Sequence, residues 1–131
     1  MPMQVELVSP ERVLFTGEAT MVQARTLGGG DIAFLSGHAP FIGALDIDQV
    51  TIRLVDGTDE IAAVHGGFIS VIDNSVKILS DLAELKDTIS VTRAQKAAAA
   101  AEEALRRGED AEAQAALQRA NARLKATGTA A

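Results

Sequence analysis

The amino-acid composition changes abruptly near residue 90, and this change constrains the fold more than any other feature of the sequence. From Val91 onward, 16 of the remaining 41 residues are alanine, and glutamine, glutamate, lysine and arginine fill most of the rest. These residues are strong helix formers. The first ninety residues instead hold all four phenylalanines and most of the β-branched residues. The sequence therefore predicts a β domain over residues 1–87 and a helical domain over residues 88–131.

The N-terminal part consists of short runs of alternating apolar residues, separated by turn signals. Val50, Ile52 and Leu54 alternate with polar residues, and Asp56-Gly57 then offers the positive φ angles of a hairpin turn. A second antiparallel pair is predicted around the turn at residues 73–75. Runs that recur about every eight to twelve residues are typical of an all-β sandwich. We therefore predict a β-sandwich of about ten short strands, interrupted at glycines such as Gly17.

The alanine-rich segment predicts an α-helical hairpin. Ser90 is of the residue type that caps helix N-termini, and Gly108 stands where a glycine commonly ends a helix. A second helix is expected to begin within residues 109–112, which are mostly acidic. It is expected to end among basic residues, as the helix dipole favours.

Few large apolar residues are available to hold this hairpin in place. Full burial of each of the four is worth at most about 1.5–3 kcal/mol. Ordering about 35 residues costs as much as all four contribute together, or more. We therefore expect persistent helices that dock weakly and can exchange partners. The large apolar residues are Val91, Leu105, Leu117 and Leu124.

Charge and residue usage exclude several classes of function. The chain has 18 acidic and 12 basic residues, a net charge of −6, and an aromatic content of 3% with no Trp or Tyr. A nucleic-acid partner is therefore not expected, since the chain has no excess of positive charge to bind phosphates and no Trp or Tyr on which bases could stack. The absence of cysteine excludes disulfides, thiolate nucleophiles and Cys-ligated zinc. Residues 1–90 carry a net charge of −8 and residues 91–131 a net charge of +2.

No apolar run approaches the roughly 18 residues needed to cross a bilayer. The N-terminus has neither the basic nor the apolar region of a secretory signal. We therefore expect a cytoplasmic chain whose association with a membrane is indirect.

The sequence contains no convincing catalytic or metal-binding motif. Gly28-Gly29-Gly30-Asp31-Ile32-Ala33 fits a loose dinucleotide-binding pattern, but a strand rather than a helix is expected after it, so a turn is favoured. His38 and His65 are the only histidines, and no third ligand is evident. We predict structural roles for both histidines, and no catalytic residue and no metal site.

Six segments, taken in order, resemble the epsilon subunit of F-type ATP synthases, the bacterial type in particular. The resemblance covers nearly the whole chain. The segments are Leu7-Val8-Ser9-Pro10-Glu11, Phe15-Thr16-Gly17-Glu18-Ala19, Gly37-His38-Ala39-Pro40, Gly66-Gly67-Phe68, Val76-Lys77-Ile78-Leu79-Ser80-Asp81 and the closing alanine-rich helical pair.

This resemblance implies a non-catalytic subunit of the central stalk, which couples rotation of the c-ring to ATP synthesis in the catalytic head. The implied partners are the gamma subunit, the c-ring and the alpha/beta head, at the cytoplasmic face of the cell membrane. We expect Gly37, His38, Ala39 and Pro40 to contact the c-ring. Gly66, Gly67 and Phe68 are expected to serve in packing.

The resemblance also implies two roles for the helices. They are expected to extend toward the catalytic head and inhibit ATP hydrolysis through Arg106, Arg107, Arg119, Arg123 and Lys125. Some family members bind regulatory ATP between these helices, and the matching residues here are Glu84, Arg93, Ala94, Arg119 and Arg123. Ser90 stands where the family has an Asp in this motif. The alternative for these arginines is that they are solvated helix charges.

Two other functions stay open at the level of the sequence. One is a soluble ATP sensor in which the hairpin closes on the nucleotide. The other is a helical adaptor that works outside the ATP synthase. None of these functions requires a cofactor.

Overall fold

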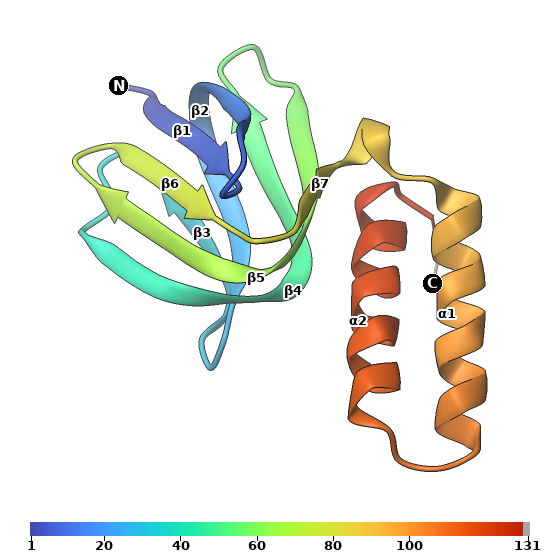
Figure 1. The fold of residues 1–131 in the computed structure, drawn as a ribbon. Helices are drawn as coiled ribbons and strands as arrows, with labels where there is room; N and C mark the ends of the chain where they lie inside the picture. The colour runs from blue at the N-terminus through green and yellow to red at the C-terminus, as the bar shows by residue number, and fades with distance from the viewer. Residues whose placement is uncertain (130–131) are drawn as a thin grey trace.

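The computed structural model describes residues 1–129, which form a β-sandwich followed by two antiparallel helices (Figure 1). The predicted fold class is confirmed. The last two residues of the predicted helical domain, 130 and 131, lie outside the described residues. The strands are β1 (Met3–Val8), β2 (Val13–Thr26), β3 (Gly30–Leu35), β4 (Phe41–Leu54), β5 (Asp59–Ile72), β6 (Ser75–Leu79) and β7 (Ala83–Leu85). A short 3-10 helix, η1 (Lys86–Thr88), leads to α1 (Val91–Arg106) and α2 (Ala111–Ala126).

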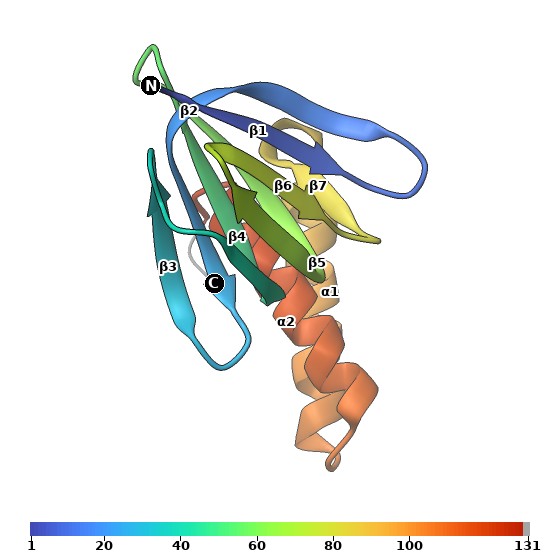
Figure 2. The same ribbon diagram turned by 90° about the vertical axis from the view of Figure 1, so that its left-hand side faces the viewer.

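The strands form one sheet that folds over on itself, in the order β1-β6-β5-β4-β2-β3. β1 pairs in parallel with β6 and antiparallel with β2, so it joins the two layers (Figure 2). β7 pairs with β5 outside this order. The alternation expected for β1 is present, since Met3, Val5 and Leu7 are buried in the core between the layers.

The structure of residues 1–129 has seven strands where about ten were expected, because long strands continue where shorter ones were predicted, as β2 does through Gly17. β2, β4 and β5 each span 14 residues. Gly17 lies within β2 opposite Val5, and from Ala19 onward the same strand pairs with β4. A glycine and an adjacent register shift allow a strand to bend from one layer to the other without ending.

The helical hairpin matches its predicted caps. The Ser90 hydroxyl accepts a hydrogen bond from the Arg93 backbone N–H at 3.3 Å, and α1 ends at Arg106, two residues before Gly108. The Asp110 carboxylate accepts hydrogen bonds from the backbone N–H groups of Glu112 and Ala113, the second and third residues of α2. None of the helices within residues 1–129 is long and apolar enough to cross a membrane.

α2 lies between the sandwich and α1, and its inner face packs on β4 and β5 (Figure 1). The contact is made by a small apolar group that we call the docking cluster. Its residues are Ala63, Ala122 and Ala126, with Ile47, Ile61 and Ile89 at its margin. Half of these side chains are single methyl groups, which offer little apolar area for burial, and the weak docking expected from the sequence stays a prediction.

Candidate functional site

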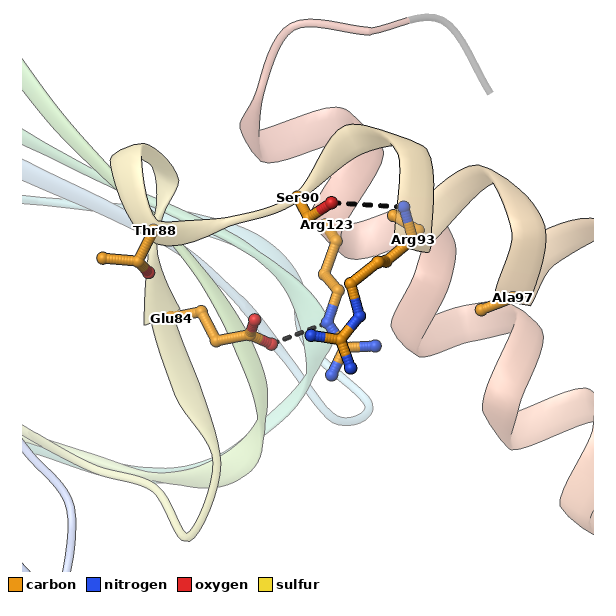
Figure 3. A pocket seen from close by; sticks show the side chains of 7 residues that line it. Glu84, Thr88, Ser90, Arg93, Ala97 and Arg123 are labelled. Carbon is orange, nitrogen blue, oxygen red and sulfur yellow. Dashed lines mark hydrogen bonds and ion pairs between the residues drawn. The ribbon is translucent and has the colours of Figure 1, made fainter.

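A pocket of about 340 Å³ lies where the sandwich meets the hairpin (Figure 3). β7 supplies Glu84, α1 supplies Arg93 and Ala94, and α2 supplies Arg123. The structure thus brings together four of the five residues predicted to hold ATP. The full lining is Glu84, Thr88, Ser90, Arg93, Ala94, Ala97 and Arg123.

Arg119, the fifth predicted residue, does not line this pocket. Its guanidinium pairs with Glu112 of the same helix at 2.9 Å. Arg119 precedes Arg123 by four residues, which places it about one helical turn, roughly 5.4 Å, nearer the tip of the hairpin. Their spacing of four residues puts both arginines on one face of α2. Which of the two lines the pocket depends on how α2 packs on the sandwich.

The pocket contains two guanidinium groups and one carboxylate. Glu84 Oε1 accepts a hydrogen bond from Arg123 Nε at 2.6 Å, so the charge of Arg123 is already paired. Arg93 extends into the same space from α1 (Figure 3). Arginines bind phosphate oxygens through two parallel N–H donors. The pocket therefore has the groups to bind a phosphorylated ligand, provided that Arg123 exchanges Glu84 for the ligand or shares it.

The loop at residues 37–40 is exposed, yet its backbone is held in place. The Gly37 N–H donates to Asn74 Oδ1 at 2.6 Å, and His38 Nδ1 lies 2.7 Å from the Ala39 carbonyl oxygen. The His38 ring packs edge-on against Phe34, with ring centroids 4.9 Å apart. This loop borders a second, more open pocket of about 650 Å³. An exposed loop whose backbone is hydrogen-bonded in this way is suited to contact a partner.

Two of the basic residues predicted to meet the catalytic head instead hold the hairpin on the sandwich. Arg123 pairs with Glu84, and Lys125 Nζ lies 3.0 Å from Asp48 Oδ1 of β4. The others stay within the hairpin: Arg106 pairs with Glu103, Arg119 pairs with Glu112, and Arg107 caps the end of α1. Contact of Arg123 and Lys125 with a head would therefore require the hairpin to leave the sandwich.

Sequence reasoning missed the place of His65 in this site. The ring is buried, with 2% of the side chain exposed, and Nε2 lies 3.1 Å from Glu84 Oε1. The alternation of Ile61, Ala63 and His65 along β5 puts all three on the face that α2 covers. This alternation is visible in the sequence and groups His65 with Ile61 and Ala63, but it does not show which helix covers that face of the sheet. Within the described residues, no group of three His, Cys, Asp or Glu side chains is arranged to hold a metal ion.

Two family models match the chain, one after the other. The model of the ATP synthase delta/epsilon chain β-sandwich domain matches residues 2–86, and that of the delta/epsilon chain long alpha-helix domain matches residues 87–128.

Curated relatives and solved structures give the same pattern. The ATP synthase epsilon chain of Streptomyces griseus is 47% identical over 124 residues, which cover 95% of this chain and 94% of that protein. The epsilon chain of Syntrophomonas wolfei is 38% identical over 127 residues, 94% of this chain and 92% of the relative. A chain of the Euglena gracilis mitochondrial ATP synthase structure has a similar fold, with a TM-score of 0.82 and 20% identity over 95% of this chain and 80% of its own length.

Proposed function

Since this chain belongs to the ATP synthase delta/epsilon chain family, we propose that its sandwich contacts the gamma subunit and the c-ring while its hairpin regulates ATP hydrolysis. The chain is a non-catalytic subunit of the ATP synthase, in its central stalk. The match of both family models, in order and over residues 2–128, carries this conclusion. It favours a stalk subunit over an ATP sensor or adaptor that works outside the complex.

The loop at residues 37–40 is the proposed contact to the c-ring. Its exposure and its fixed backbone support this role, because a preorganised loop loses little conformational entropy on binding. In this arrangement the chain lies at the cytoplasmic face of the cell membrane, held there through the complex. The sandwich then transmits rotation of the c-ring toward the catalytic head.

The hairpin is the proposed regulator, through release from the sandwich and contact with the alpha/beta head. Docking rests on the docking cluster and on two ion pairs, Arg123–Glu84 and Lys125–Asp48. Arg123 and Glu84 are each about one-quarter exposed, at 25% and 26%. The Lys125 side chain is 58% exposed, and exposed pairs contribute only about 0.2–1 kcal/mol, so a partner is able to compete for the hairpin.

The first test measures ATP hydrolysis by the cognate head lacking this subunit, after addition of the chain. The full chain is expected to inhibit, and added salt to weaken the inhibition. The double variant Arg106→Ala/Arg107→Ala is expected to inhibit about two- to thirtyfold more weakly, since exposed charge pairs are worth about 0.2–1 kcal/mol each. These two arginines are suited to the test because their contacts lie within the hairpin.

Lys96→Ala is the matched control for this experiment, because it removes an exposed positive charge from the same helix outside the predicted contact set. A chain that ends at Lys86 should bind the complex without inhibiting it. Undiminished inhibition by the arginine double variant would rule out the electrostatic contact with the head. If neither the full chain nor the shortened chain bound the complex, the assignment to the stalk would be wrong.

We propose regulatory ATP as a second function of the hairpin, with the pocket of Figure 3 as its site. The convergence of Arg93 and Arg123 on one pocket supports this. Equilibrium dialysis of the full chain is expected to show binding in the millimolar range, weaker by about tenfold or more in Arg93→Ala, since a hydrogen bond between charged groups is worth about 1.5–3 kcal/mol. Arg119→Ala, outside the lining, serves as the control and should bind as the unaltered chain does. Absence of binding at about 10 mM ATP would refute the proposal.

A further inference from the structure

His65 connects the sandwich to the hairpin through a shared carboxylate. Its Nε2 lies 3.1 Å from Glu84 Oε1, and the same oxygen accepts the 2.6 Å hydrogen bond from Arg123 Nε. One residue each from β5, β7 and α2 therefore meets at a single atom. Neither function proposed above uses the histidine.

The hydrogen-bond geometry determines which ring nitrogen carries the proton. An ionised carboxylate only accepts hydrogen bonds, so Nε2 must be the N–H donor to Glu84. In the neutral ring, Nδ1 is then the bare nitrogen. It is buried and has no hydrogen-bond partner among residues 1–129. A further proton would have to be placed on Nδ1.

Protonation at Nδ1 is unfavourable while the hairpin is docked. It would create a buried N–H donor without an acceptor and a second positive charge beside Arg123. Burial first, and then the charge of Arg123, lower the pKa of His65 below its ordinary value, with a smaller contribution from Arg119. The hydrogen bond and negative charge of Glu84 oppose this shift but do not outweigh it.

Charged groups around His65 come from β4, β7, α1 and α2. β7 supplies Glu84, and α2 supplies Arg123 and Arg119. Arg93 of α1 shares the pocket with Glu84. On β4, Ile47 is the cross-strand partner of His65, and the next residue, Asp48, is paired with Lys125. Release of the hairpin removes all the cations in this set and leaves Glu84 and Asp48, the two carboxylates.

The hairpin is what covers this face of the sheet. Ala63, two residues before His65 and on the same face of β5, packs against Ala122 and Ala126 of α2. When α2 leaves, the His65 ring becomes accessible to water and its pKa returns toward the ordinary value of about 6.5 or above. The released form therefore binds a proton that the docked form excludes.

We propose that protonation of His65 releases the helical hairpin from the sandwich, so that a fall in pH just below neutrality loosens the docked state. The inference rests on the release of the hairpin proposed above, but not on inhibition of the head. The stabilisation of the docked state by neutral His65 is complete above the pKa of the released form and is lost as the pH falls below it. One proton is involved, so the docking equilibrium constant falls by at most about tenfold per pH unit.

The test uses the full chain and a distance measured between two spin labels. Because the sequence has no cysteine, one label can be attached to Gln23→Cys on the sandwich and one to Glu102→Cys on α1, both exposed positions. Double electron–electron resonance is recorded from pH 7.5 to 5.5, above the range near 4 in which ordinary carboxyl groups titrate. The population of the released distance is expected to rise as the pH falls, by up to about tenfold over one pH unit.

His65→Gln keeps a hydrogen-bonding side chain but cannot be protonated, and it should abolish the pH dependence. His38→Gln is the matched control, since it removes the other histidine of the chain and should leave the transition unchanged. A pH-independent distance in the unaltered chain, or an unchanged transition in His65→Gln, would overturn the proposal.

A second measurement needs no substitution at His65. In NMR spectra of the unaltered chain, the His65 ring and the backbone amides of residues 119–126 should titrate with one midpoint. Different midpoints would contradict the proposal, even if His65→Gln failed to fold. Neither experiment involves the catalytic head, so failure of the inhibitory role and failure of the His65 mechanism are distinguishable.

Discussion

Replacement of Gly67 with alanine is expected to lower the free energy of unfolding by about 3–5 kcal/mol, because two costs combine at this position. The φ angle of Gly67 is +120°, which residues with a side chain rarely adopt. A Cβ atom there would also meet the backbone at the end of β6, the Leu79 carbonyl oxygen and, at 2.9 Å, the Ser80 Cα. Backbone atoms cannot move aside as a flexible side chain can. Urea denaturation followed by circular dichroism measures the loss.

Gly66→Ala is the matched control for this prediction. Gly66 also has a positive φ, +85°, but the nearest atom to its Cβ position within the described residues is the Leu45 carbonyl oxygen at 3.9 Å. Only the backbone cost remains, about 1–2 kcal/mol. Equal losses in the two variants would show that the close approach of β5 to the end of β6 is unimportant. Of the two adjacent glycines, only Gly67 lies directly against the backbone of a neighbouring segment.

Phe34→Ala is expected to cost about 3–5 kcal/mol of unfolding free energy and to loosen the loop at residues 37–40. Phe34 is fully buried, with 0% exposure, and is the largest such side chain of the core. Its ring packs against His38 at 4.9 Å and against Phe41 at 5.3 Å between centroids. Removal of the ring leaves a cavity and takes away the support of the loop. Urea denaturation gives the stability, and amide hydrogen exchange at residues 37–39 reports on the loop.

Phe68→Ala removes the same side chain from a position that is 60% exposed. In the isolated chain this variant should change the stability by about 0.5 kcal/mol or less, because little apolar area is lost from the core. A comparable loss in both variants would contradict the assignment of Phe34 as the anchor of the loop. Protected amides in the Phe34→Ala loop would show that the Gly37–Asn74 hydrogen bond is sufficient to hold it.

The helical part could be predicted in detail because its signals are local. Ser90, Gly108 and Asp110 act within one turn of their own helix end, through hydrogen bonds to neighbouring backbone groups. The hairpin at Asp56-Gly57 is equally local, and the structure joins β4 to β5 there. Weak docking of the hairpin stays a prediction from the sequence, made because an alanine-rich segment offers little apolar area to bury.

The candidate site could be predicted only in part. Matching to the family motif identified Glu84, Arg93, Ala94 and Arg123, and the structure brings these four to one pocket. The same reasoning included Arg119, which the docking angle of α2 leaves outside the lining. The contact of Arg123 and Lys125 with a catalytic head stays a prediction for the released hairpin, and in the docked hairpin both side chains pair with the sandwich.

The sequence by itself determined the division into a β domain and a helical hairpin, where the helices begin and end, and the family of the chain. Tertiary structure alone decided that β2, β4 and β5 continue through their glycines, because a glycine is a break or a bend depending on the strands available to pair on either side. It also decided that His65 and Arg123 both bond to one carboxylate oxygen of Glu84, from which they lie 19 and 39 residues away in the sequence. Contacts at such separations depend on how the hairpin packs on the sheet, and no local pattern of residues encodes that packing.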